Sequence, residues 1–206
     1  MIGEHKMIKD FHELYSDAST KYIGGYVKMA GFTQFWQMPS VIITGVEPTH
    51  RNINILEAVA ALLTLWQFFM NIKRFPYLDK FCKQYLDNKS VGWAFASYRT
   101  TLKNEMFSRI IMIKAIIMYN NSSFLEYIPS IENKLADKIS RVKKDEILDI
   151  EEVGNNFYKN ASKLIKCLKI TRLEFLSFCE RVLQHQNHNK FVINWLLFTN
   201  LNSMTF

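Results

Sequence analysis

The sequence predicts an α/β fold, in which helices flank a mixed β-sheet and a helical extension follows. Strand-like segments open the chain, strand-like and helix-like segments alternate between residues 50 and 141, and the pattern is helical after residue 143. Alternation of this kind is typical of a sheet with helices packed on its faces. Hydrophobic residues make up 49% of the 206 residues, which is enough for a substantial core. We therefore expect one domain over residues 8–143 and a helical extension of unassigned role over residues 144–206.

Three strands are expected before the first long helix. The candidate segments are residues 11–19, residues 26–29 after Gly24-Gly25, and residues 34–43, which include Pro39. Each contains aromatic or β-branched residues and is bounded by turn residues, as strands are. Proline places a break in the third segment, because it cannot donate to a strand ladder. The three strands would form an antiparallel meander in the same sheet as the later strands.

A long helix is predicted after a loop at residues 44–52. Apolar residues recur at positions 55, 56, 59, 62, 63, 66, 69 and 70, which matches the helical repeat. Asn54 is the expected N-cap, and Pro76 bars a simple continuation. The segment 53–72 is the most apolar of the chain, but it contains Glu57 and is amphipathic. We therefore expect a packed helix rather than a membrane span.

The second half of the domain is expected to alternate strands with helices. The predicted elements are a strand at residues 81–86, a short helix at 90–96, a buried helix at 106–118, a strand at 123–129, and a helix from Asn133 through Arg141. Beyond them, the acids between residues 145 and 152 indicate a solvated linker or helix face. Residues 156–198 again carry apolar stripes at helical spacing.

Net charge and cysteine content indicate the cellular compartment and the charge of a partner, but they do not identify the partner. A net charge of +7 favours an anionic partner, and nucleic acid, an acidic membrane and an acidic protein all fit it. The cysteines, at positions 82, 167 and 179, have no zinc-ligand spacing, and their odd number argues against a disulfide framework. No secretory pattern opens the chain. We expect reduced thiols in an intracellular protein, in the cytoplasm or the nucleus, without a membrane partner.

Four acidic residues occupy informative positions in these elements. Asp17 ends the first strand, Glu57 lies in the first turn of the long helix, Asp87 ends the middle strand, and Asp137 lies in the first turns of the last helix of the domain. In an open α/β sheet, strand ends and neighbouring helix termini meet in one crevice. Carboxylates gathered there repel one another unless cations hold them, and magnesium takes carboxylate and phosphate oxygens as ligands. Two such ions about 4 Å apart can orient a water and stabilise the leaving oxygen of a phosphodiester.

Each acid taken alone also has an ordinary structural explanation. Asp17 and Asp87 suit turns, and Asp137 suits a charged helix surface. Glu57 follows Asn54 by three residues, which is the spacing of a capping box. The prediction of a metal site therefore rests on the four acids together.

Four short motifs carry a resemblance to one family. In chain order they are Ser-Asp-Ala-Ser at 16–19 followed by Gly24-Gly25, Ile-Asn-Ile-Leu-Glu at 53–57 preceded by His50-Arg51, Leu-Asp-Asn-Lys-Ser-Val at 86–91, and Ile-Pro-Ser-Ile-Glu-Asn-Lys-Leu-Ala-Asp-Lys-Ile-Ser-Arg at 128–141. Their order and approximate spacing resemble the ribonuclease H domains of retroelement reverse transcriptases, of the DIRS type and related branches. The last motif is the most specific, with Ser130 where the family usually has glycine.

The resemblance implies a five-stranded mixed sheet flanked by helices, and an enzyme that cleaves the RNA strand of an RNA–DNA hybrid. It implies that Asp17, Glu57, Asp87 and Asp137 are the ligands of two Mg²⁺ ions, for which Mn²⁺ can substitute. The products would carry a 5′-phosphate and a 3′-hydroxyl. A domain of this kind belongs to a retrotransposon polyprotein, so a reverse transcriptase domain is an expected partner in cis or in trans.

Substrate contacts are expected around the acids. The candidates are Gly24, Gly25, Asn88, Lys89, Ser90, Arg99, Lys103 and Asn133, with Arg109 as a further cation. Ser90 and Asn133 are expected to support either the site itself or its substrate. Basic side chains would hold the nucleic-acid backbone without reading its sequence, and the two glycines would let that backbone come close. An ordinary solvated surface explains the basic residues equally well. Two other functions stay open: a catalytically inactive nucleic-acid-binding or scaffolding domain of the same fold, and an interaction protein whose acids are incidental.

Overall fold

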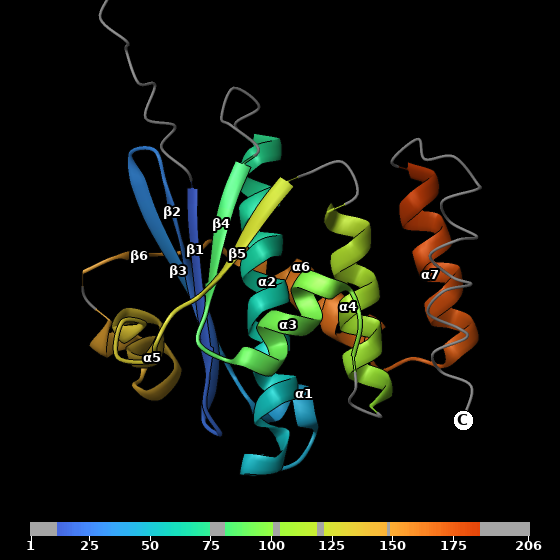
Figure 1. Cartoon of the computed structure of the whole chain (residues 1–206), viewed down its shortest axis with the longest axis horizontal. Helices are drawn as coiled ribbons and strands as arrows, with labels where there is room; N and C mark the ends of the chain where they lie inside the picture. The colour runs from blue at the N-terminus through green and yellow to red at the C-terminus, as the bar shows by residue number, and fades with distance from the viewer. Residues whose placement is uncertain (1–11, 75–80, 101–103, 119–121, 148, 186–206) are drawn as a thin grey trace, which may run out of the picture.

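The computed structural model describes residues 12–74, 81–100, 104–118, 122–147 and 149–185, which form a mixed six-stranded sheet with helices on both faces (Figure 1). The strands are β1 (His12–Ala18), β2 (Tyr22–Met29), β3 (Phe32–Pro39), β4 (Phe81–Leu86), β5 (Ser122–Tyr127) and β6 (Glu151–Glu152), in the spatial order β5-β4-β1-β2-β3-β6. The first three strands form the predicted antiparallel meander, and β4 and β5 continue the sheet in parallel with β1. The predicted α/β class is therefore confirmed.

Two expectations about the first strands are corrected. β2 begins at Tyr22, so Gly24 and Gly25 lie inside the strand rather than before it. β3 ends at Pro39, and the segment expected to extend the third strand forms the short helix α1 (Val41–Thr44). Proline has no N–H with which to continue the ladder. Gly45, at φ 75°, then ends the helix in the left-handed conformation that glycine tolerates.

The long helix α2 (Ile53–Arg74) begins one residue before its predicted cap. A 3₁₀ turn, η1 (His50–Asn52), leads into it and carries its own capping box. Asn54 lies inside the helix, where its Oδ1 accepts a 2.9 Å hydrogen bond from Asn88. The predicted N-cap is therefore wrong, and so is the capping box with Glu57. Glu57 instead lies in the second turn of α2, and helix capping does not explain its presence.

Among the described residues, one helix is long and apolar enough to cross a membrane, over His50–Ile72 with a mean hydropathy of 1.6. Within this protein, 67% of that apolar stretch is buried. It belongs to α2, which packs on β1 and β2 on one side and on α4 (Glu105–Met118) on the other (Figure 1). Leu56, Leu62 and Phe68 are fully buried there. This packing explains the apolar composition of α2 as that of a core helix.

The helices predicted in the second half are confirmed, with shifts of one residue at their ends. Besides α4 they are α3 (Lys89–Ser97) and α5 (Lys134–Arg141). α5 packs on β1, β2 and β3, on the face of the sheet opposite α2 (Figure 1). Ala136 and Ile139 of α5 are buried in this second, smaller core. α5 thus covers one end of the second face of the sheet.

The segment after residue 143 shares the core of the domain. It forms η2 (Lys144–Glu146), β6, α6 (Asn155–Cys167) and α7 (Arg172–His185). The acidic stretch expected to be a linker or helix face contributes a 3₁₀ turn and β6, which pairs in parallel with β3. Residues of α6 and α7 join the main hydrophobic core: Phe157, Ala161, Leu164, Ile165, Phe175 and Cys179. The part of the predicted helical tail from residue 186 to residue 198 lies outside the described residues.

Candidate metal centre

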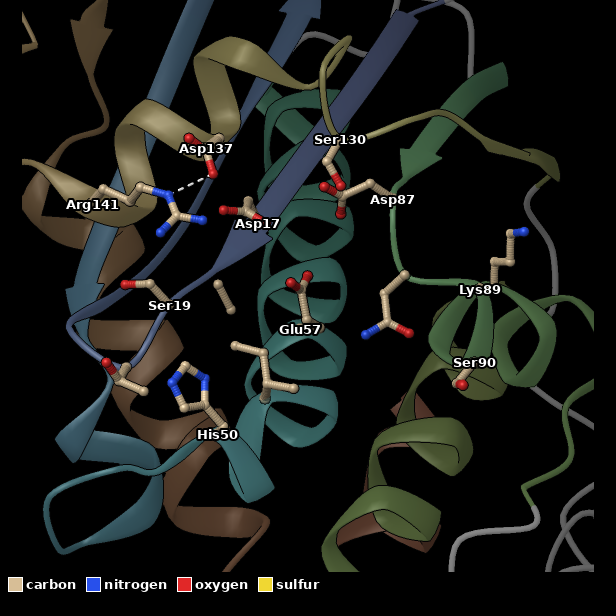
Figure 2. A pocket seen from close by; sticks show the side chains of 14 residues that line it. Asp17, Ser19, His50, Glu57, Asp87, Lys89, Ser90, Ser130, Asp137 and Arg141 are labelled. Atoms are coloured by element: carbon tan, nitrogen blue, oxygen red, sulfur yellow. Dashed lines mark hydrogen bonds and ion pairs between the residues drawn. The ribbon is translucent and has the colours of Figure 1, made fainter.

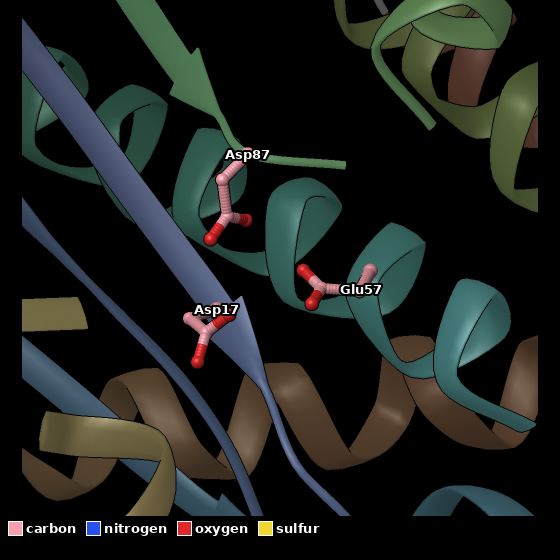
Figure 3. Close-up of side chains that lie close together, drawn as sticks. All are labelled: Asp17, Glu57 and Asp87. Carbon is pink, nitrogen blue, oxygen red and sulfur yellow. The ribbon is translucent and has the colours of Figure 1, made fainter. Parts of the chain in front are cut away.

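Three acids meet where β1 and β4 end. Asp17 is the penultimate residue of β1, Asp87 follows the last residue of β4, and Glu57 extends toward them from α2 (Figure 3). One carboxylate oxygen from each residue lies within 4.8 Å of the other two. β1 and β4 are parallel neighbours, so their carboxyl ends bring Asp17 and Asp87 to the same edge of the sheet. The structure therefore brings together three of the four predicted acids.

Asp137, the fourth predicted acid, lines the same cleft but lies outside this group. It stands in the first turn of α5, and it borders a cleft of about 500 Å³ together with the other three acids (Figure 2). Its Oδ1 forms a 2.6 Å ion pair with Nε of Arg141, one helical turn further on. The four acids therefore share one cleft, with three grouped closely and the fourth paired to arginine.

Hydrogen bonds fix α5, and with it Asp137, against β1. At the start of the helix, Nδ2 of Asn133 donates a 3.0 Å bond to the backbone oxygen of Ser16. At its end, the Ser140 hydroxyl donates to the carboxylate of Asp17. Asn133 was expected to support either the site or its substrate, and its buried side chain supports the site by anchoring the helix. Ser140 and Arg141 were not among the predicted site residues, although both close the fourth motif.

Burial makes the negative charge of the grouped acids costly. Asp17 and Glu57 are only 5% and 7% exposed. Burial raises the pKa of Asp17, the Ser140 hydrogen bond lowers it, and the charges of Asp87 and Asp137 raise it further. Burial raises the pKa of Glu57 well above its ordinary value, and the charges of Asp17 and Asp87 add to this effect. Both shifts are those expected of buried carboxylates that have no ion-pair partner.

A divalent cation fits this group of acids. Among the described residues, no basic side chain forms an ion pair with Asp17, Glu57 or Asp87. A cation bound between the three carboxylates would therefore provide the missing positive charge. The donors are all oxygens, which are the ligands that Mg²⁺ and Mn²⁺ prefer, whereas zinc centres usually include cysteine or histidine. The group is able to hold a metal ion of the oxygen-preferring kind.

Polar side chains line the cleft around the acids (Figure 2). Asn88 caps α3 by accepting a 3.1 Å hydrogen bond from the backbone N–H of Val91, and Lys89 and Ser90 follow it. These three predicted substrate contacts do border the cleft. The remaining lining residues are Ala18, Ser19, Thr20, His50, Ile53, Ser130 and Arg141. All of these except Thr20 lie in the quoted motifs, which was the only sequence signal that distinguished them.

Gly24 and Gly25 serve packing rather than substrate contact. Both are buried inside β2. A Cβ atom on Gly24 would overlap Ile139 of α5, and a Cβ atom on Gly25 would overlap the hydroxyl of Thr64 in α2. The two glycines therefore let helices approach the sheet closely from opposite faces. The protein's own side chains fill the space that a nucleic-acid backbone was expected to use.

The other predicted basic contacts do not line the cleft. Arg99 is exposed just beyond α3, and Lys103 lies outside the described residues. Arg109 is buried in α4, where it donates a 3.2 Å hydrogen bond to the backbone oxygen of Leu168 and packs over the ring of Phe175 at 5.0 Å. It therefore holds the segments after residue 143 against α4 rather than contacting a substrate.

The candidate site thus consists of two buried acids and the half-buried Asp87, a fourth acid paired to arginine, and a polar cleft around them. Its donor atoms suit a divalent cation. Comparison of the chain with protein-family models, with curated protein sequences and with solved structures gave no match.

Proposed function

We propose that this chain is a metal-dependent endoribonuclease of the ribonuclease H type, which cleaves the RNA strand of RNA–DNA hybrids. One observation carries the proposal: four acids chosen from four separate sequence motifs line one cleft, and three of them have oxygens within 4.8 Å of one another. Incidental acids would have no reason to converge in this way. The resemblance of the motifs further suggests an origin in a retrotransposon polyprotein, with a reverse transcriptase domain acting in cis or in trans.

The fold supports this proposal. The family is expected to have a five-stranded mixed sheet flanked by helices, and this chain has a mixed sheet in which the sixth strand, β6, is only two residues long. Asp17 and Asp87 lie at the carboxyl ends of two parallel strands, where open α/β sheets bind their ligands. We therefore infer a ribonuclease H-like fold from topology and motifs together.

The four acids would hold two Mg²⁺ ions, with Asp17, Glu57 and Asp87 as the closely grouped ligands and Asp137 as the fourth ligand. Bound magnesium would orient the attacking water and stabilise the leaving oxygen of the phosphodiester. The hydroxyl of Ser140 favours the ionised form of Asp17, which is the form that binds a cation.

The walls of the cleft would hold the substrate. Lys89 and Arg141 bring positive charge to the cleft, and Asn88 and Ser90 add hydrogen-bonding groups beside Lys89. Contacts of these kinds bind phosphates and sugars and position a strand without reading its bases. This matches a nuclease that selects a hybrid by its backbone.

Cleavage of a labelled RNA–DNA hybrid in the presence of Mg²⁺ tests the proposal. Asp87→Asn should reduce the rate by at least about a hundredfold, because it removes a charged metal ligand. Asp145→Asn provides the matched control, since Asp145 is an exposed acid of η2 outside the cleft. Products should end in 5′-phosphate and 3′-hydroxyl groups, and EDTA should abolish their formation. Equal cleavage by wild type and Asp87→Asn, or cleavage by neither, would contradict the enzyme assignment.

A further inference from the structure

Asp137 stands apart from the other acids because Arg141 engages it. The oxygens of Asp17, Glu57 and Asp87 form one close group, and Asp137 is not part of it. Asp137 is instead paired with Arg141, and both residues line the cleft. In this structure the guanidinium already supplies the positive charge next to the fourth carboxylate.

We infer that Arg141 competes with a divalent cation for Asp137, so that the site binds one ion readily and a second only when Arg141 is released. This inference rests on the proposed function, which assigns two ions to the four acids. The first ion would use the three grouped carboxylates, none of which has an ion-pair partner among the described residues. The second ion needs Asp137, and Arg141 must let go of it first.

The exposure of the Arg141–Asp137 pair makes such an exchange accessible. The side chains of Arg141 and Asp137 are 62% and 40% exposed. Ion pairs in contact with water are weak, so a divalent cation at millimolar concentration can replace the guanidinium. The neighbouring contact behaves differently, because Ser140 is fully buried and offers Asp17 a neutral hydroxyl. Two consecutive residues thus have opposite effects on two acids. Ser140 favours cation binding by Asp17, and Arg141 hinders cation binding by Asp137.

The guanidinium of Arg141, once released from Asp137, could bind the substrate. Once Asp137 binds an ion, the guanidinium of Arg141 is free at the wall of the cleft. Arginine forms strong paired hydrogen bonds with phosphate. Occupation of the second metal position would therefore make Arg141 available to the substrate backbone, and would couple the binding of that ion to the binding of substrate.

Calorimetric titration with Mg²⁺, and in parallel with Mn²⁺, tests this inference on the full chain without nucleic acid. Wild type should show a tight and a weak binding event. Arg141→Gln should tighten the weak event by about two- to fivefold, which is the range expected when a water-exposed ion pair is removed. The tight event should change less, because Arg141 interacts with the charges of Asp17 and Asp87 but forms its ion pair with Asp137. Asp137→Asn should abolish the weak event only.

Lys138→Gln is the matched control, since it removes one positive charge from the exposed side of α5 without touching the cleft. It should leave both events within about twofold of wild type, because a charge on the solvent side of the helix is screened. An Arg141→Gln variant with unchanged or weaker second binding would overturn the inference, and so would a wild-type chain that binds one ion or none. If both ions bind as expected but the hybrid is not cleaved, the proposed function is wrong, whereas the competition between Arg141 and the second cation is still supported.

Discussion

Ser140 donates a hydrogen bond to the carboxylate of Asp17, and this contact joins α5 to the end of β1 across 123 residues of sequence. Asn133 makes the corresponding link at the other end of α5, to the backbone of β1. Arg141, the residue after Ser140, pairs with Asp137. The position of Asp137 relative to Asp17 is therefore determined by hydrogen bonds at both ends of one short helix.

Replacing Ser140 with alanine is expected to weaken divalent-cation binding. The hydroxyl lowers the pKa of Asp17, so its loss leaves a buried carboxylate that keeps its proton more readily at neutral pH. Hydrogen bonds to charged groups contribute roughly 1.5–3 kcal/mol, so we expect cation affinity to decrease by about tenfold or more. Calorimetric titration measures the change, with Ser162→Ala in α6 as the control. Equal affinities for wild type and Ser140→Ala would mean that this hydrogen bond does not tune Asp17.

The buried acids also predict how stability depends on pH in the absence of divalent cations. Folding raises the pKa of Glu57 well above its ordinary value of 4.5. Between pH 4.5 and the pKa of Glu57 in the folded chain, Glu57 keeps its proton in the folded chain and has released it in the unfolded chain. The contribution of Glu57 to the free energy of unfolding is therefore greatest below pH 4.5 and is lost as the pH rises through the folded-state pKa.

Glu57→Gln isolates this effect. In EDTA at pH 7 the variant should be more stable than wild type by about 1 kcal/mol or more, because each unit of pKa shift corresponds to about 1.4 kcal/mol. Urea unfolding at pH 4 and pH 7 measures the difference, which should shrink at the lower pH. Mg²⁺ should stabilise wild type and have little effect on the variant. A variant that is less stable than wild type at pH 7 without cations would argue against an uncompensated charge at Glu57.

The strands and helices that carry the acids could be predicted because their patterns are local. The strand at 81–86 is bounded as expected, and this put Asp87 at a strand end. The separation of Asp137 from the other acids could not be predicted in the same way. It depends on how α5 is seated on β1 by Asn133 and Ser140, and such distant contacts leave no periodicity in the sequence. Arg141 likewise acquires its role only through the side-chain geometry of α5.

The pair Gly24-Gly25 shows that the neighbour of a glycine cannot be predicted from sequence. Either a ligand or another part of the protein can lie close to a residue that has no side chain. At Gly25 the close neighbour is Thr64 of α2, not a ligand. Gly25→Ala should therefore destabilise the fold by about 1–3 kcal/mol through overpacking. Gly92→Ala is the control, since a Cβ atom there meets nothing within 4 Å and alanine favours the helix. Chemical denaturation compares the two, and equal stabilities would contradict the packing role of Gly25.

From the sequence, Arg109 was a plausible phosphate contact. The residues around it in the sequence do not show that its partners are buried and lie far along the chain. In the structure, the backbone oxygens of Leu168 and Ile170 accept hydrogen bonds from its guanidinium, and the ring of Phe175 packs against it. Arg109→Met leaves these carbonyl groups without their donor, so we expect a loss of about 2–4 kcal/mol in unfolding free energy.

The exposed Arg99 is the matched control for Arg109, and Arg99→Gln should change stability by less than about 0.5 kcal/mol. Thermal and urea unfolding of both variants provide the comparison. A second measurement separates packing from substrate binding: the salt dependence of hybrid binding should be the same for Arg109→Met as for wild type, at a temperature where both are folded. If Arg109→Met reduces the salt dependence of hybrid binding and leaves the unfolding free energy unchanged, Arg109 contacts the substrate and does not hold α7 against α4.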